Sequence, residues 1–492
     1  MQTTIRDMDE RYIAAVDLGT SKIALSVAKV EGNDVQIIYY DEVPSNGIRY
    51  SAIFNPAKVL VPLKSILQKA QKDLGIKILQ VVVGLPRYYV RQETATGEIP
   101  RSNVESNITR EEIENLKNIA LDTYPLSDSE HEYIYGAVAQ SFTTDDFYQI
   151  VEDDVEGMVS EKLEGNFKVF VGSRKSVSNL DKIFNEAGVA IGMKYFTPGA
   201  MAKVVLFGEE MDNGVALIDL GGGVTSVSVY KNNILRHYAA IPFGGNSITT
   251  DIKTEGGFSM ELAENIKLAF GACMPDKLAN MSEKILRILN NDSGAEKQLS
   301  VRYLSEIITA RVEEIVNAIL YEIQNSGFAD ELRSGIVITG GGAELVNIAN
   351  FIKELSGYNV RVGYPIRKFS SDGCAGIGET GATGVIGMLL AAKDDNKKLN
   401  CLEEPPKPHV EEEAAGESVE EEPAPEETEA ASMEGSVLDG KAWETVKPAK
   451  KPQPRTPRPP KPKKEPVFWK RVEEKIGGLF AGVDQMYENI ED

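Results

Sequence analysis

The chain has few cysteines and no spacing in which they could act together. Its 492 residues include only Cys273, Cys374 and Cys401, and no two of them form a CxxC pair. Disulfide frameworks, zinc knuckles and iron–sulfur sites need such clusters, so the sequence argues against all three. A reducing cytosolic environment is the expectation.

Long hydrophobic runs are also lacking. The N-terminal segment, MQTTIRDMDERY, is polar and charged. The most apolar late stretch, residues 376–392, contains Glu379 and several glycines, and it falls short of the roughly 20 apolar residues that a spanning helix needs. We therefore expect neither a signal peptide nor a transmembrane helix.

Positive charge is in deficit. The chain carries 53 Lys and Arg against 75 Asp and Glu, a net charge of −22. Such a chain repels the phosphate backbone of nucleic acids, so no nucleic-acid partner is expected.

The organisation of the chain follows from changes in its patterning. Alternating β-rich and helical runs from about residue 11 to 392 predict an α/β protein. An acidic segment at 88–165, whose Thr109 and Glu112 form a capping box, predicts an inserted subdomain between two strands, 81–86 and 167–172, that suit the main sheet.

After residue 392 the composition changes. Residues 402–446 hold 15 acidic and two basic side chains, which predicts a disordered acidic linker. Residues 447–464 hold eight basic residues and seven prolines, which predicts an extended spacer. We place the linker as a whole at 393–466.

The strongest motif is a repeat of a strand, an aspartate and a glycine turn, followed by a second strand. Asp17 and Asp219 occupy equivalent places, 202 residues apart, and both turns predict β-hairpins rather than the strand-to-helix turn of a dinucleotide site. Glycine N–H groups and nearby hydroxyls can bind phosphates, and the two aspartates can hold the waters of a magnesium ion. The phosphate-binding candidates are Gly19, Thr20, Ser21, Gly221, Gly222, Gly223 and Thr225.

Two further glycine turns lie beyond the second hairpin. The text IPFGGN, with Gly244 and Gly245, opens a helical region in which Glu264 and Lys267 share one face and could reach a ribose and a base. A solvated surface pair is the alternative for those two side chains. The turn at Gly340, Gly341 and Gly342 follows a strand and could pass close to a flat base.

This order of motifs resembles the actin-like ATPase superfamily. Within it, MDNGVALIDLGGGVTSVSVY, HYAAIPFGGNSITTDI and the following AENIKLAFG are similar to the FtsA family of bacterial cell-division proteins, over residues 12 to about 392. The resemblance implies a two-lobed, ribonuclease-H-like fold with ATP and Mg²⁺ between the lobes, and it adds Lys22 to the binding residues. It implies lobe I at 11–87, 166–205 and 370–392, the family's inserted subdomain at 88–165, and lobe II at 206–369.

One departure bears on hydrolysis. Several hydrolysing relatives carry a Glu before the proline that opens the helix preceding the second hairpin, whereas this chain has Thr197 before Pro198. A threonine cannot act as a general base near neutral pH, so at most weak ATPase activity is expected.

The last 26 residues, 467–492, regain an apolar period typical of an amphipathic helix. A basic spacer before a helix with Trp and Phe on its apolar side is typical of an in-plane membrane anchor. A helix that docks on its own globular domain or on a protein partner remains the alternative. The predicted membrane-binding residues are Phe468, Trp469, Val472, Ile476, Leu479, Phe480 and Val483.

The resemblance implies a function in the assembly of the division site. It implies an ATP-binding, self-polymerising adaptor that tethers the tubulin-like protein FtsZ to the inner face of the cytoplasmic membrane. The adaptor would also bind other division proteins. Arg311 is a candidate for the FtsZ contact. The alternatives are a pilus-assembly actin homologue and a small-molecule kinase, which would need a carboxylate base in the cleft.

Overall fold

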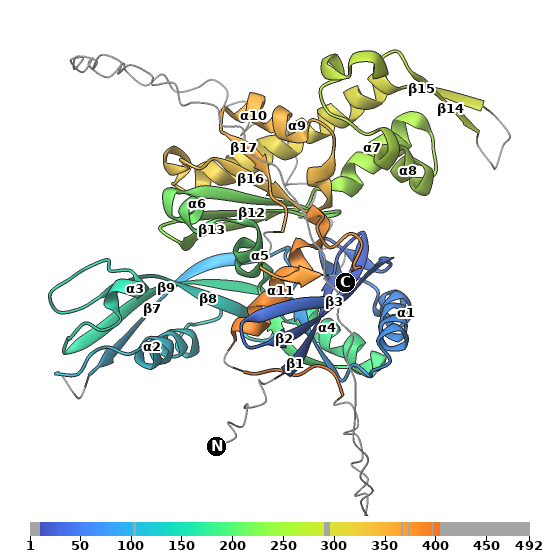
Figure 1. The fold of residues 1–492 in the computed structure, drawn as a ribbon. Helices are drawn as coiled ribbons and strands as arrows, with labels where there is room; N and C mark the ends of the chain where they lie inside the picture. Colours follow the sequence, from blue (N-terminus) through green and yellow to red (C-terminus); the bar gives the residue numbers. More distant parts are fainter. Residues whose placement is uncertain are drawn as a thin grey trace, which may run out of the picture. The chain divides into compact units, whose positions relative to one another are not determined.

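The computed structural model describes residues 10–101, 105–289, 296–365, 368–371, 373–395 and 397–403 (Figure 1). The predicted amphipathic helix and nearly all of the predicted linker lie outside these residues. Among the described helices, none has the length and apolar character needed to span a bilayer.

A six-stranded sheet forms the centre of lobe I, in the order β10-β6-β1-β2-β3-β18 (Figure 1). The strands β1, β2 and β3 are antiparallel, and β6 and β10 add in parallel beside β1. Both β1 and β2 are buried in runs rather than in alternation, as expected of strands covered on both faces. The strands span Glu10–Leu18 (β1), Lys22–Glu31 (β2), Asp34–Pro44 (β3), Gln80–Gly84 (β6), Ala190–Tyr195 (β10) and Ser370–Ser371 (β18).

Four helices cover this sheet. The helix α1 packs against α4 and β3, and α11 packs against α5, β1 and β2. Asn55 caps α1 by accepting a hydrogen bond from the backbone of Lys58, and Gly75 ends the helix in the left-handed conformation. The helices span Pro56–Leu74 (α1), Arg174–Ala187 (α4), Thr197–Val205 (α5) and Thr383–Asp394 (α11).

Lobe II repeats this plan with a five-stranded sheet in the order β13-β12-β11-β16-β17. Again three antiparallel strands come first in the chain, and two parallel strands add beside the first of them. The strands span Val215–Leu220 (β11), Thr225–Lys231 (β12), Ile234–Ile241 (β13), Ile336–Thr339 (β16) and Val360–Val362 (β17). The helices are Gly208–Asn213 (α6), Gly245–Gly256 (α7), Met260–Phe270 (α8), Val301–Asn325 (α9) and Ile348–Ser356 (α10).

Several short elements complete both lobes. Two of them, β14 and β15, form an antiparallel hairpin between α8 and α9. The short strands span Ile48–Arg49 (β4), Ala52–Ile53 (β5), Ile285–Leu289 (β14) and Glu296–Ser300 (β15). The 3-10 helices span Pro275–Lys277 (η1), Ala279–Met281 (η2), Ala329–Glu331 (η3), Gly341–Glu344 (η4) and Thr380–Ala382 (η5).

The inserted subdomain has a three-stranded sheet in the order β7-β9-β8 and its own buried core, which includes Leu116, Phe142 and Phe167. The predicted capping box is present, since Thr109 and Glu112 exchange hydrogen bonds at the start of α2. Its elements span Arg91–Pro100 (β7), Arg110–Asp122 (α2), Glu132–Thr143 (β8), Glu152–Val155 (α3) and Lys162–Ser173 (β9).

One predicted strand belongs to a different sheet from the one expected. Residues 81–86 overlap β6 of the main sheet, as predicted. Residues 167–172 lie in β9, which pairs along its length with β7 and β8. The prediction that both strands join the main sheet was therefore wrong for the second, because an apolar run does not specify its pairing partner.

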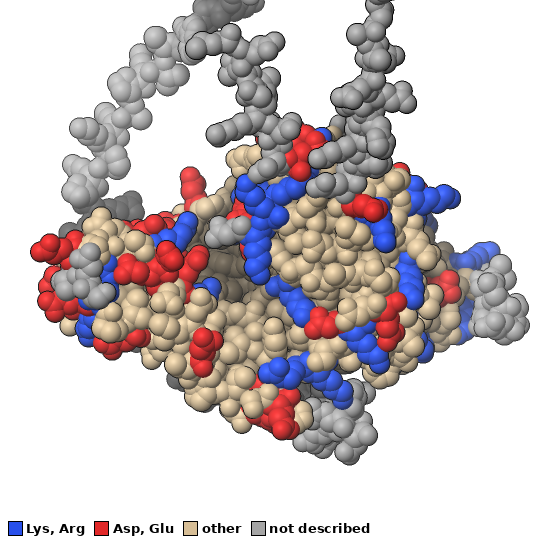
Figure 2. Space-filling model, turned by 90° about the horizontal axis from the view of Figure 1, so that it is seen from below, with Lys and Arg blue, Asp and Glu red and all other residues tan. Residues whose placement is uncertain are grey.

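The inserted subdomain carries much of the chain's negative charge. Residues 88–165 include 18 Asp and Glu against five Lys and Arg. Figure 2 shows acidic side chains gathered over this part of the molecule, on the left of the view.

Candidate functional site

The two aspartate-bearing hairpins have the same backbone geometry. In the first, the Gly19 amide donates to the carbonyl of Lys22 at 3.0 Å, and in the second Gly221 donates to Val224 at 3.0 Å. Asp17 pairs with Ala24 across β1 and β2, and Asp219 pairs with Ser226 across β11 and β12. The internal repeat predicted from the sequence is therefore present as two equivalent hairpins.

The tips of the two hairpins, one from each lobe, approach each other closely. A Cβ atom on Gly222 would overlap the hydroxyl of Ser21, and one on Gly223 would lie 2.8 Å from the side chain of Thr20. The Ser21 hydroxyl also lies 3.1 Å from Oδ1 of Asn246, at the start of α7. Glycine is thus required at 222 and 223 for the hairpins to approach this closely.

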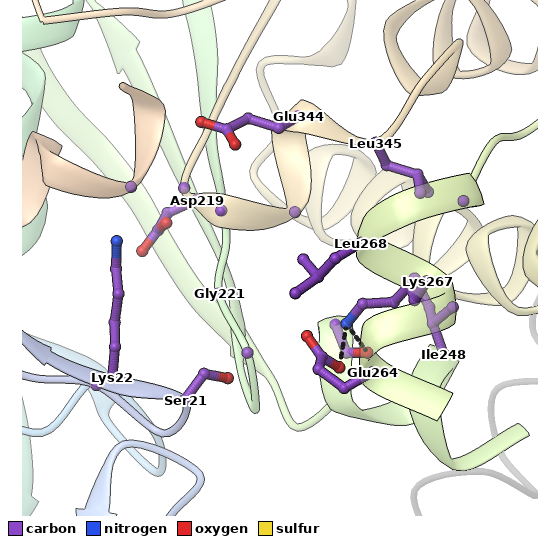
Figure 3. Close-up of a pocket in the computed structure, with 18 of the residues that line it drawn as sticks. Ser21, Lys22, Asp219, Gly221, Ile248, Glu264, Lys267, Leu268, Glu344 and Leu345 are labelled. Atoms are coloured by element: carbon purple, nitrogen blue, oxygen red, sulfur yellow. Dashed lines mark hydrogen bonds and ion pairs between the residues drawn. The ribbon is translucent and has the colours of Figure 1, made fainter. Parts of the chain in front are cut away.

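A cavity of about 740 Å³ lies between these hairpins and the helices of lobe II. Its volume is typical of a small-molecule site and is adequate for a nucleoside triphosphate. Figure 3 shows the hairpin residues Ser21, Lys22, Asp219 and Gly221 on the left of this space, and Glu264 and Lys267 on the right. The predicted residues that line it are Asp17, Gly19, Thr20, Ser21, Lys22, Asp219, Gly221, Gly222, Gly223, Gly245, Glu264, Lys267, Gly340, Gly341 and Gly342.

Glu264 and Lys267 form a fixed pair rather than a solvated one. The ammonium of Lys267 lies 2.8 Å from Oε2 of Glu264 (Figure 3). It also donates to the carbonyl of Gly245 at 3.0 Å and to Thr249 Oγ1 at 2.9 Å. The Thr249 hydroxyl donates in turn to Glu264. With a side chain only 11% exposed, Lys267 joins α8 to the start of α7 at the cavity wall.

The glycine turn after β16 packs directly on the second hairpin. Gly340 has a φ of +81°, and a Cβ there would overlap Oδ1 of Asp219. A Cβ on Gly342 would lie 2.9 Å from the side chain of Leu220. Thr380 donates to the carbonyl of Gly340 at 2.8 Å and to Glu344 at 3.0 Å, which fixes this turn at the cavity edge.

Apolar side chains line the cavity at α8 and beyond it. Leu268 projects toward the open space in Figure 3 and is 73% exposed, and Val346 is 57% exposed. Exposed apolar groups of this size beside a polar cradle are suited to covering a flat aromatic base.

Three residues singled out in the sequence are placed away from the cavity wall. The Thr225 side chain is fully buried, and its hydroxyl donates to the carbonyl of Phe243 at 2.9 Å. Gly244 is not among the lining residues, although its neighbour Gly245 is. Thr197 is also buried and does not line the cavity, and its hydroxyl has no hydrogen-bond partner among the described residues.

Lys22 lines the cavity but is already paired. Its ammonium forms an ion pair with Glu42, which also accepts a hydrogen bond from the hydroxyl of Tyr40. Burial, followed by the contact with Glu42, raises the pKa of Tyr40 above its ordinary value, so the phenol remains protonated.

Arg87 is a cleft residue that the sequence analysis missed. Its guanidinium contacts Asp219 directly, and its Nη2 lies 3.7 Å from Oδ2 of Asp17. It follows β6, which runs parallel to β1, so the two carboxyl ends share one edge of the sheet. A basic residue just after the strand at 81–86 was the signal that could have found it.

The residues present fit a hydrated divalent cation. Asp17 and Asp219 come from different hairpins, and both approach the guanidinium of Arg87. One cation between them can therefore interact with both carboxylates. Within the described parts of the chain, no three metal-ligating side chains gather. A metal here would therefore keep most of its waters and take its other ligands from phosphates, as magnesium usually does.

Arg311 lies on α9, away from the cavity. It forms a two-pronged ion pair with Asp251 of α7 and a further pair with Glu314. The hydrogen bond with Asp251 raises the pKa of the guanidinium above its ordinary value. The side chain is 23% exposed, so its charge is satisfied within lobe II.

The two lobes of matching topology, each with an aspartate–glycine hairpin at the cavity, define a class, the actin-like proteins. The family model described as Cell division protein FtsA matches residues 216–377. The chain is 30% identical over 350 residues to the cell division protein FtsA of Enterococcus hirae, covering 71% of this chain and 77% of that protein. The chain belongs to the FtsA family of cell division proteins.

A second relative and a solved structure are also similar to this chain. The FtsA protein of Neisseria meningitidis serogroup B is 29% identical over 364 residues, which covers 73% of this chain and 85% of that protein. Among solved structures, a chain of the PilM-PilN type IV pilus biogenesis complex is similar with a TM-score of 0.56 and 16% identity, over 78% of this chain and 99% of that one. At that identity the likeness shows the fold alone.

Proposed function

We propose that this chain is an ATP-binding, polymerising adaptor that tethers FtsZ to the cytoplasmic face of the cell membrane at the division site. The single observation that carries the nucleotide part is the pair of equivalent hairpins, one from each lobe, that together line a cavity of about 740 Å³. Backbone N–H groups at paired glycine turns are suited to phosphate oxygens, and lobes built in duplicate supply one turn from each side.

Different residues of the cleft bind different parts of the nucleotide. The turns at Gly19 and Gly221 bind the phosphates, and Asp17 and Asp219 hold the waters of Mg²⁺. Glu264 and Lys267 sit on α8, opposite the turn at Gly340, so the nucleoside lies between these two elements. When bound, the magnesium ion neutralises phosphate charge.

Hydrolysis is proposed to be slow. The cavity carboxylates among the described residues already have partners, since Asp17 and Asp219 contact Arg87, Glu264 contacts Lys267, and Glu344 accepts from Thr380. None is placed as an evident base for an attacking water. The nucleotide then acts chiefly on conformation and assembly. The same absence of a base among these residues disfavours a small-molecule kinase.

The membrane part of the proposal rests on residues 467–492, which lie outside the described residues. Their apolar period, with Trp469, Ile476 and Phe480, follows a spacer that contains eight basic residues. Membership of a cell division family supports FtsZ and other division proteins as partners. Lobe II, around Arg311, is the proposed FtsZ surface.

A liposome pelleting assay tests this function. The full chain with ATP and Mg²⁺ is expected to pellet with anionic vesicles and to carry purified FtsZ with it, whereas FtsZ alone stays in the supernatant. Trp469→Glu with Phe480→Glu is expected to abolish pelleting, since burying such side chains is worth roughly 1.5–3 kcal/mol each. Val446→Glu, in the linker, is the matched control. Equal pelleting of the double variant would contradict the anchor.

A further inference from the structure

The charges that line the cavity are balanced within the protein. The described lining residues include four basic and four acidic side chains. Each of the basic ones already has an acidic partner, so a polyphosphate would bring negative charge to a site with no spare cation among its described lining residues. The ion pairs are Lys22–Glu42, Arg87–Asp219, Lys267–Glu264 and Lys277–Glu354.

Arg87 differs from the other three in what it joins. Lys267 and Glu264 lie one turn apart on α8, and the partners of Lys22 and Lys277 do not line the cavity. Arg87 alone, among the described lining residues, contacts the hairpin carboxylates of both lobes, Asp17 and Asp219. Its guanidinium thus holds the position between two carboxylates that a hydrated metal ion would need.

The backbone of Arg87 is held in place, so only its side chain is available to move. Its N–H donates to Ser51 Oγ at 3.2 Å, and its carbonyl accepts from the hydroxyl of Tyr238 at 2.7 Å. Ser51 belongs to lobe I and Tyr238 to β13 of lobe II. The Arg87 side chain is 15% exposed, and its flexible stem reaches the cavity from this anchor.

We propose that Arg87 is an exchangeable cation of the cleft. Without nucleotide it neutralises Asp17 and Asp219 and draws the two hairpins together. When a magnesium nucleotide enters, the divalent ion takes over the two carboxylates, and the guanidinium is released to pair with the phosphates. This inference rests on the proposed nucleotide site and assigns a role in it to a residue outside the glycine motifs.

The exchange predicts how the nucleotide-free protein responds to a divalent ion. In the wild-type chain, magnesium alone must compete with a guanidinium that is already in place, so it binds weakly. In Arg87→Ala, two carboxylates from opposite lobes face each other without a cation, and a divalent ion relieves their repulsion. The variant should therefore depend on magnesium for part of its stability, whereas the wild type should not.

Thermal unfolding of the nucleotide-free full chain, in EDTA and in MgCl₂, tests the proposal. The midpoint of Arg87→Ala is expected to rise by about 3 °C or more with magnesium, against less than about 1 °C for the wild type. Arg49→Ala is the matched control, because Arg49 is an exposed guanidinium stacked on Phe54, away from the cavity. It should behave as the wild type does. An Arg87→Ala protein indifferent to magnesium would overturn the exchange.

Two further variants keep the test decisive. Arg87→Ala with Asp219→Asn removes one of the facing carboxylates, so its response to magnesium should disappear. If Arg87→Ala does not fold in EDTA, Arg87→Lys, with one positive charge but no fork, should show an intermediate magnesium response, and a response equal to that of the wild type would count against the proposal. Fluorescent-ATP binding, measured separately, reports on the nucleotide site itself. Its absence in the wild type would overturn the proposed function.

Discussion

The side-chain nitrogen of Gln92 lies 2.7 Å from Nδ1 of His237, and this contact joins the inserted subdomain to lobe II. The same glutamine accepts a hydrogen bond from the backbone of Tyr238 at 3.1 Å, and His237 reaches Glu322 of α9 at 3.2 Å through its other ring nitrogen. Gln92 lies in β7, the first strand of the inserted subdomain. In the chain, β7 comes directly after the lobe I strand β6. The inserted subdomain therefore connects the two lobes through residues that do not line the cavity.

Gln92→Ala should loosen this connection. Losing both hydrogen bonds is expected to lower the free energy of unfolding by about 1–2 kcal/mol and to speed hydrogen exchange in β13. Gln36→Ala, on an exposed position of β3, is the control and should change neither. Urea denaturation and exchange mass spectrometry make the comparison, and unchanged exchange across residues 234–241 would contradict the role given to Gln92.

The stability of the inserted subdomain should depend on pH through Glu112. The hydrogen bond from Arg101, whose side chain is 1% exposed, is the main cause that holds the pKa of Glu112 below its ordinary value, and the backbone of Thr109 adds to it. A carboxyl with a lowered folded pKa contributes stability above its unfolded pKa of about 4.3 and loses that contribution as the pH falls through the folded value.

Glu112→Gln should therefore destabilise the protein near pH 7 by about 2 kcal/mol, and the difference from the wild type should shrink below about pH 4. Glu111→Gln, the exposed neighbour in the same first turn, serves as the control and should be close to neutral at both pH values. Chemical denaturation at a series of pH values measures this. A difference that persists undiminished in acid would mean that the Arg101 ion pair is not its source.

A methyl group at the hairpin tip should affect ligand binding. In Gly222→Ala the added carbon would overlap Ser21, which forces the hairpins apart at a cost of about 1–3 kcal/mol and should weaken nucleotide binding by at least about tenfold. Gly199→Ala places its Cβ in open space in α5 and should leave affinity unchanged. Fluorescent-nucleotide titration compares the two, and equal affinities would show that the hairpin approach is not needed for binding.

The cysteines should differ in reactivity. Burial raises the pKa of Cys273 to about 12 and that of Cys401 to about 11, so neither forms much of the reactive thiolate at pH 8. Cys374 has intermediate exposure and should alkylate first in the native protein. Peptide mass spectrometry after a timed exposure to iodoacetamide, with a denatured sample for reference, reads out the order. Early labelling of Cys273 would contradict its burial.

The parts of the fold that were predictable from the sequence are those in which local pattern determines structure. The two strand–aspartate–glycine segments were predicted as hairpins, because the alternation of apolar and polar residues and the glycine turn are properties of neighbouring residues. The hairpins carry Asp17 and Asp219, and most of the predicted residues that line the cavity lie on these two hairpins. The capping box at Thr109 was likewise a local signal.

The errors and omissions come from long-range pairing. The strand at 167–172 joins the inserted sheet, and only its partners β7 and β8 decide that. Arg87 reaches the aspartates because β1 and β6 pair in parallel although they are about 65 residues apart in the chain. Thr225 lies on a strand buried on both faces, so alternation did not reveal which way its side chain points.

The central claim is that the two facing hairpins bind one magnesium nucleotide, and titration calorimetry with ATP and Mg²⁺ tests it most directly. The full chain should bind one ATP, and Asp17→Ala and Gly222→Asp should both weaken binding, because the first removes a holder of metal-bound water and the second places a carboxylate against the phosphates. An unchanged affinity in both variants would contradict the account.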